Sequence, residues 1–245
     1  MNWRLEIAVQ TPAHSALGDV LSYTHPSPVA PGALVRVPLG RREVLGVVWS
    51  AQPAGADDGA AALELKPVGA VLDALPPLGA AWRDLVAFAA RYYQRSLGEI
   101  ALAALPPQLR DLSAVQLARR LKRQAAPAAA AASACVPALT PEQAQALARY
   151  ETESGPFLLF GSTGSGKTEV YLQAVAALLE REPQAQALVM VPEINLTPQL
   201  EARFKDRFGS GAVVSLHSGM TNPQRLASWL AAHGATARIV LGTRM

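Results

Sequence analysis

The chain is poor in cysteine, in net charge and in long apolar runs. Its single cysteine excludes an internal disulfide and a cysteine zinc site. No apolar run approaches the roughly 18 residues of a membrane span. Arg4 and Glu6 lie where a secretory signal would have its apolar stretch, so no such signal is predicted. A net charge of +3 is too small to predict binding to a nucleic acid from overall charge alone. These shortages predict a cytoplasmic globular protein without membrane association, in which any contact with DNA depends on local sites.

The most informative stretch is a complete phosphate-loop pattern. Gly161 and Gly166-Lys167-Thr168 satisfy the spacing G-x-x-x-x-G-K-[ST]. The apolar residues 157–160 before it predict a buried strand, and residues 169–180 after it predict a helix. In such a loop, backbone N–H groups and the helix N-terminus bind phosphates. Lys167 would reach the β- and γ-phosphates and Thr168 would ligate Mg²⁺, so the loop predicts a nucleoside triphosphate site.

Residues 1–105 predict a small β-rich domain. Polar and apolar residues alternate over 4–9, 32–38 and 42–49, with a turn at residues 39–41, which favours a small barrel or sandwich. From residue 78 to 95 the spacing becomes helical and predicts one face packed against the barrel. The members of that face are Trp82, Leu85, Val86, Ala89, Tyr92 and Tyr93.

Residues 106–138 predict a linker, first basic and then rich in Ala and Pro. Its basic residues fit either a solvated tether or a strap across a DNA backbone. From 139 to 245, apolar and helix-spaced segments alternate, starting with the helix signal Thr140, Pro141 and Gln143. The predicted strands are 187–191, 213–216 and 238–241, and the predicted helices are 140–154, 198–208 and 223–233. This alternation predicts an α/β fold: a truncated RecA-like P-loop domain with a parallel sheet, preceded by a small β-rich, barrel-like domain.

Four local motifs occur in a characteristic order. They are GSTGSGKTEVYL at 161–172, VMVPEINLTPQ at 189–199, LHSG at 216–219 and IVLGTR at 239–244. Together with VRVPLG at 35–40, LKPV at 65–68 and Tyr92-Tyr93, they resemble the PriA family of superfamily 2 replication-restart helicases. The resemblance implies an ATP- and Mg²⁺-dependent 3′-to-5′ DNA helicase that assembles primosomes at stalled forks, with primosome and single-strand-binding proteins as partners. It also implies an N-terminal fragment, because no acidic motif follows the P-loop, and a fragment of this kind is expected to lack ATPase activity.

The resemblance assigns roles position by position. The predicted nucleotide-binding residues are Gly161, Thr163, Gly164, Ser165, Gly166, Lys167 and Thr168, with Gln143 at adenine. The predicted DNA contacts are Ser22, Tyr23, Gly40 and Lys66 in a pocket for the 3′ end, and Thr197, Thr243 and Arg244 on the backbone. Tyr23 would stack on the terminal base, while Ser22 stands where the family often has an aspartate that accepts the 3′-hydroxyl. The winged-helix insert of many members is absent, and the family's zinc-binding cysteines have no counterpart in this chain.

Each of these assignments has an alternative. Gln143 also completes a helix capping box, and Thr197 also fits an N-cap for the following helix. The alternative roles are a core residue for Tyr23, a solvated lysine for Lys66 and a structural histidine for His217. For the whole chain, the alternatives are another P-loop NTPase, such as a recombinase or a kinase, and a DNA-end-binding module with a non-hydrolysing P-loop.

Overall fold

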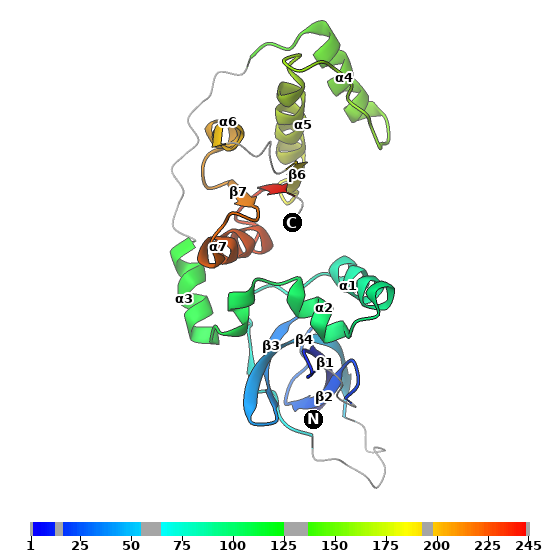
Figure 1. The fold of residues 1–245 in the computed structure, drawn as a ribbon, viewed down its shortest axis with the longest axis vertical. Helices are drawn as coiled ribbons and strands as arrows, with labels where there is room; N and C mark the ends of the chain where they lie inside the picture. Colours follow the sequence, from blue (N-terminus) through cyan, green and yellow to red (C-terminus); the bar gives the residue numbers. More distant parts are fainter. Residues whose placement is uncertain (1, 13–16, 55–64, 125–136, 193–197, 244–245) are drawn as a thin grey trace. The chain divides into compact units, whose positions relative to one another are not determined.

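The computed structural model describes residues 2–12, 17–54, 65–124, 137–192 and 198–243 (Figure 1). They form two compact units, Met1–Ala125 with Thr221–Ala227, and Ala126–Met220 with Ser228–Met245. A hydrophobic cluster lies around Ile7 and Val35 in the first unit, and another lies around Phe204 and Ile239 in the second. Over the described ranges, no helix is both long and apolar enough to cross a membrane.

The first unit is built on a five-stranded antiparallel sheet with the strand order β2-β1-β4-β3-β5. The strands are β1 (Trp3–Val9), β2 (Leu21–His25), β3 (Leu34–Leu39), β4 (Arg42–Pro53) and β5 (Ala70–Val71). A two-residue turn at Gly40-Arg41 joins β3 to β4, and Gly40 has the positive φ of +61° that such tight hairpins favour. This confirms the predicted β-rich region, to which the structure adds β2.

The helices of the first unit are α1 (Ala80–Tyr93), α2 (Leu97–Ala103), the 3₁₀ helix η1 (Pro107–Arg110) and α3 (Ala114–Gln124). The predicted packed face of α1 is wrong for three of its six members. Val86 and Ala90 are buried, whereas Leu85, Tyr92 and Tyr93 are 63%, 68% and 65% exposed. Helical spacing determines which residues share a face, but the neighbouring elements decide which face is covered, and α1 packs closely against α2.

Part of the predicted linker is folded onto the first unit. Leu109, Leu112 and Leu117 in and around η1 and α3 are buried. The guanidinium of Arg36, only 6% exposed, donates hydrogen bonds to the carbonyls of Leu109, at 2.9 Å, and of Arg110 and Leu112. Burial lowers the pKa of Arg36, and nearby carboxylates oppose that shift. Arg36 therefore holds residues 107–112 against the sheet, whereas residues 125–136 lie outside the described ranges.

The second unit contains a three-stranded parallel sheet with the order β6-β8-β7. The strands are β6 (Ala187–Val191), β7 (Val213–Leu216) and β8 (Ile239–Thr243). The helices are α4 (Pro141–Thr152), α5 (Lys167–Arg181), α6 (Pro198–Phe208) and, from Ser228 on, α7 (Asn222–His233). The predicted alternation of parallel strands and helices is confirmed.

The strand predicted directly before the phosphate loop is not present. Residues 157–160 have no regular secondary structure, and Leu158 and Phe160 are 91% and 93% exposed. None of the described strands pairs with this segment. An apolar run predicts a buried parallel strand only where neighbouring strands cover it, and a local pattern carries no information about those neighbours.

Candidate functional site

The phosphate loop leads directly into α5. Gly166 is the N-cap of this helix with φ +81°, and Gly164 has φ +85°. The positive φ favours glycine at position 166, and a Cβ added there would lie 2.2 Å from Nε2 of Gln143 and displace the end of that side chain. The N-terminus of α5 is thereby directed at the loop, where its dipole favours a bound anion.

The ammonium group of Lys167 is held over the loop by the loop's own backbone. Nζ donates hydrogen bonds to the carbonyls of Gly161, at 2.6 Å, and Ser162, at 2.7 Å. A phosphate oxygen is a charged acceptor and would bind the ammonium more strongly than these neutral carbonyls. The loop, the lysine and the helix N-terminus thus lie together at one place, and the binding of ATP by these residues stays a prediction.

Gln143 connects the start of α4 to the loop. Its Oε1 accepts from the backbone N–H of Thr140 at 2.9 Å, which together with the Thr140 hydroxyl completes the predicted capping box. Its Nε2 donates to the carbonyls of Ser165 and Gly166, both at 3.3 Å. The capping alternative is therefore realised, and the same amide also contacts the phosphate loop. The contact with adenine stays a prediction.

A cavity of about 970 Å³ opens beside the loop. Its lining includes Gln143, Lys167 and Thr168, together with Arg203 and Arg207 from α6. Within the described part of the chain, no group of three His, Cys, Asp or Glu side chains could hold a metal ion. Binding of Mg²⁺ by Thr168 and the nucleotide phosphates stays a prediction. No local sequence pattern pointed to the two α6 arginines, because they follow the loop by more than thirty residues.

The residues predicted to bind a DNA end lie on β2, at Gly40 and at Lys66. Hydrogen bonds connect β2 to Lys66 and to the segment just before Gly40. The hydroxyl of Tyr23 donates to the carbonyl of Pro38 at 3.0 Å, two residues before Gly40. The backbone N–H of Thr24 donates to the carbonyl of Lys66 at 3.0 Å. Tyr23 is only 4% exposed, and burial raises its pKa. Its ring is part of the core and has no free face, so base stacking on Tyr23 does not fit this structure.

Ser22 belongs to a cluster of polar side chains on β1 and β2. Its hydroxyl donates to Oε1 of Glu6 at 2.8 Å and accepts from Nη2 of Arg4 at 3.0 Å. Arg4 and Glu6 are themselves 2.9 Å apart, with side chains 34% and 19% exposed. Antiparallel pairing places Glu6 directly opposite Ser22. Only strand register reveals this cluster, since its members are well separated in sequence.

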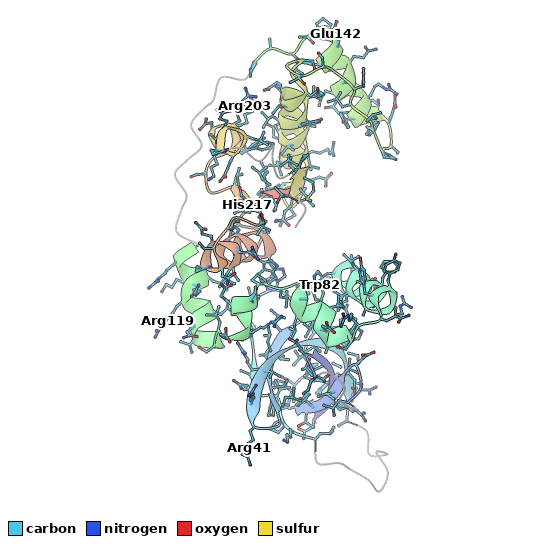
Figure 2. The ribbon with its side chains drawn as sticks, in the orientation of Figure 1. Arg41, Trp82, Arg119, Glu142, Arg203 and His217 are labelled. Atoms are coloured by element: carbon cyan, nitrogen blue, oxygen red, sulfur yellow. The ribbon has the colours of Figure 1, made fainter. Side chains whose placement is uncertain are left out.

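The remaining predicted residues differ in placement. Thr197 and Arg244 lie outside the described residues. Thr243, at the end of β8, is 5% exposed, and its hydroxyl has no hydrogen-bond partner among the residues that the structure describes. A contact between the Thr243 hydroxyl and a DNA backbone therefore requires a conformation in which this hydroxyl is exposed. His217, labelled in Figure 2, directly follows β7 and is half-buried.

Comparisons with known proteins match both parts of the chain. The model of the PriA "3′DNA-binding domain (3′BD)" matches residues 6–106, and that of the "DEAD/DEAH box helicase" matches residues 140–245. The replication restart protein PriA of Treponema pallidum is 30% identical over 243 residues, which are 98% of this chain and 35% of that protein.

Two further relatives match shorter stretches. PriA of Bacillus subtilis is 48% identical over 88 residues, 36% of this chain and 11% of the relative. PriA of Haemophilus influenzae is 47% identical over 108 residues, 43% of this chain and 14% of the relative. The chain thus spans between 11% and 35% of the length of these proteins. Its domain matches and its similarity over nearly its whole length place the chain in the family of the replication restart protein PriA.

Proposed function

We propose that this chain is the DNA-end-binding and nucleotide-binding part of an ATP-dependent 3′-to-5′ DNA helicase of replication restart. The observation that carries the proposal is the phosphate loop on α5, with Lys167 positioned over it, in the same chain as a PriA-type 3′ DNA-binding domain. The substrates are forked or single-stranded DNA with a 3′ end. Primosome and single-strand-binding proteins are the expected partners, in the cytoplasm.

In the nucleotide site, the backbone of residues 163–168 cradles the phosphates, and Lys167 exchanges its two carbonyl acceptors for phosphate oxygens. Thr168 ligates Mg²⁺, and the Gln143 amide lies beside the loop, where adenine would be read. Hydrolysis also needs a carboxylate that orients water and an arginine that stabilises the transition state. No Asp-Glu motif follows the loop in this sequence, so the chain alone binds ATP without hydrolysing it. Zinc belongs to cysteines outside this chain.

In the DNA-end site, Lys66 is exposed and supplies charge for a phosphate, while Gly40 lets the sugar approach the backbone. Glu6 supplies the carboxylate that Ser22 lacks. The hydroxyl proton of Ser22 is already donated to Glu6 at 2.8 Å, so the acceptor for a terminal 3′-hydroxyl is the Glu6 carboxylate. Tyr23 supports this site from the core through its bond to Pro38. Thr197 and Arg244 contact the DNA backbone in the helicase region, and Thr243 would join them only in a conformation that exposes its buried hydroxyl.

Two binding measurements test the proposal. Titration calorimetry with Mg²⁺-ATP should show binding to the 245-residue chain that Lys167→Ala removes. Fluorescence anisotropy should show tighter binding of a DNA end that carries a 3′-hydroxyl than of one that carries a 3′-phosphate. Absence of ATP binding in the unaltered chain would refute the nucleotide site, equal affinity for the two ends would refute the end-reading pocket, and ATP hydrolysis by the chain alone would refute its assignment as a non-hydrolysing part.

A further inference from the structure

The helix α6 brings a second group of cations to the phosphate-loop cavity. Arg203 and Arg207 lie one turn apart on α6 and line the same cavity as Lys167 and Thr168. All of these residues belong to the second unit. The cavity also carries the carboxylates of Glu169 and Asp206. The two arginines differ in how they are held, and this difference assigns them different roles.

Arg207 is held by an ion pair to the first turn of the phosphate-loop helix. Its Nη1 lies 3.8 Å from Oε1 of Glu169, and the two side chains are only 12% and 18% exposed. The same carboxylate oxygen accepts a hydrogen bond from Nε2 of Gln173 at 3.1 Å. Glu169 is two residues from Lys167, so this pair fixes α6 beside the N-terminus of α5.

Arg203, labelled in Figure 2, is exposed. Its guanidinium makes no ion pair with another described residue. It also lines a second cavity, which is shared with Thr168 and Tyr171 of α5. An arginine in this position has a free, planar set of five N–H donors, and that geometry matches phosphate oxygens. The neighbouring Lys205 differs, because its ammonium is paired with Glu201 at 2.5 Å and is not part of the phosphate-loop cavity.

We infer that Arg203 binds the phosphates of the nucleoside triphosphate directly, and that Arg207 is a positioning residue that Glu169 holds in place. The inference rests on the proposed nucleotide site and extends it to a residue outside the loop. Lys167 and Arg203 then hold the phosphates from two elements, α5 and α6. Binding of the triphosphate therefore links α6 to the phosphate loop. A nucleoside monophosphate would gain little affinity from Arg203.

The test compares Arg203→Gln with the matched control Lys205→Gln in the 245-residue chain, using calorimetric titration with Mg²⁺-ATP and with AMP. Loss of one charge-assisted contact should weaken ATP binding on the order of tenfold. AMP binding should change less than threefold, and the control should bind ATP as the unaltered chain does. Arg203→Lys should give an intermediate affinity, because it keeps the charge and loses the planar fork. Unchanged circular dichroism and thermal unfolding establish that each variant is folded.

The outcomes separate this inference from the proposed function. If the unaltered chain does not bind ATP, the nucleotide site itself is refuted and the inference falls with it. If the chain binds ATP and Lys167→Ala does not, but Arg203→Gln binds ATP normally, only the inference is overturned. Loss of single-stranded DNA affinity in Arg203→Gln with normal ATP affinity would likewise overturn it and place Arg203 on a nucleic-acid surface. Equal losses of affinity for ATP and for AMP would show that Arg203 does not bind the phosphates by which the two nucleotides differ.

Discussion

Replacing either of two glycines of the phosphate loop by alanine should separate backbone strain from the role of Gln143. Gly164 and Gly166 have nearly equal φ values, +85° and +81°. An alanine at either position incurs about 1–2 kcal/mol of backbone strain. A Cβ at position 164 would meet nothing within 4 Å, whereas at position 166 it would lie 2.2 Å from Nε2 of Gln143. Gly164→Ala is therefore a matched control for Gly166→Ala.

The additional cost at position 166 follows from the bonds of Gln143. Its side chain must move and lose two 3.3 Å hydrogen bonds to the loop, and the 2.9 Å bond from Thr140 is disturbed as well. At about 0.5–1.5 kcal/mol for each net hydrogen bond, the further loss is roughly 1–3 kcal/mol. Gly166→Ala should thus lower the free energy of unfolding by about 2–5 kcal/mol and Gly164→Ala by about 1–2 kcal/mol.

Hydrogen exchange of peptides from α4 and α5 in the ligand-free chain measures this difference. It reports local and global opening of the second unit separately from the first. Gln143→Ala should be costly in the unaltered chain and nearly without effect in the Gly166→Ala background, because both changes remove the same contacts. The reasoning is refuted if the two glycine variants lose equal protection, or if the losses from Gly166→Ala and Gln143→Ala simply add.

Three further predictions concern single residues. Lys167→Ala should abolish ATP binding in calorimetry and leave the affinity for a DNA 3′ end unchanged in anisotropy measurements; loss of both would show that the two units do not act independently. Glu6→Gln should remove most of the preference for a 3′-hydroxyl over a 3′-phosphate end, and an unchanged preference would exclude Glu6 as the acceptor. Since burial raises the pKa of Tyr23 above its ordinary 10.0, the neutral phenol stabilises the folded state below pH 10, and that contribution is lost as the pH rises through the raised pKa. Tyr23→Phe should therefore reduce the fall in stability that urea unfolding detects above pH 10, and an identical pH dependence in both chains would contradict the burial argument.

Local sequence patterns determined the secondary structure of the second unit well. The strands 187–191 and 213–216 and the helix 198–208 were predicted with the bounds that the structure has, because each combines a clear period with clear end signals. The phosphate loop was also readable, since its chemistry depends on residues that are contiguous in the chain. The capping box of Thr140 and Gln143 was predicted for the same reason.

Tertiary structure decided which surfaces are covered and which distant side chains meet. Leu158, Phe160 and the α1 side chains Tyr92 and Tyr93 look like core residues in sequence, yet they are exposed, because burial depends on partners that a local pattern does not specify. Tyr23 looked like a stacking platform and is buried. The contact of Ser22 with Glu6 depends on strand register, and that of Glu169 with Arg207 depends on helix packing. The sequence alone thus determined the phosphate-loop pattern and the family. The fold decided which side chains surround the sites, because long-range contacts arise only when separate segments pack together.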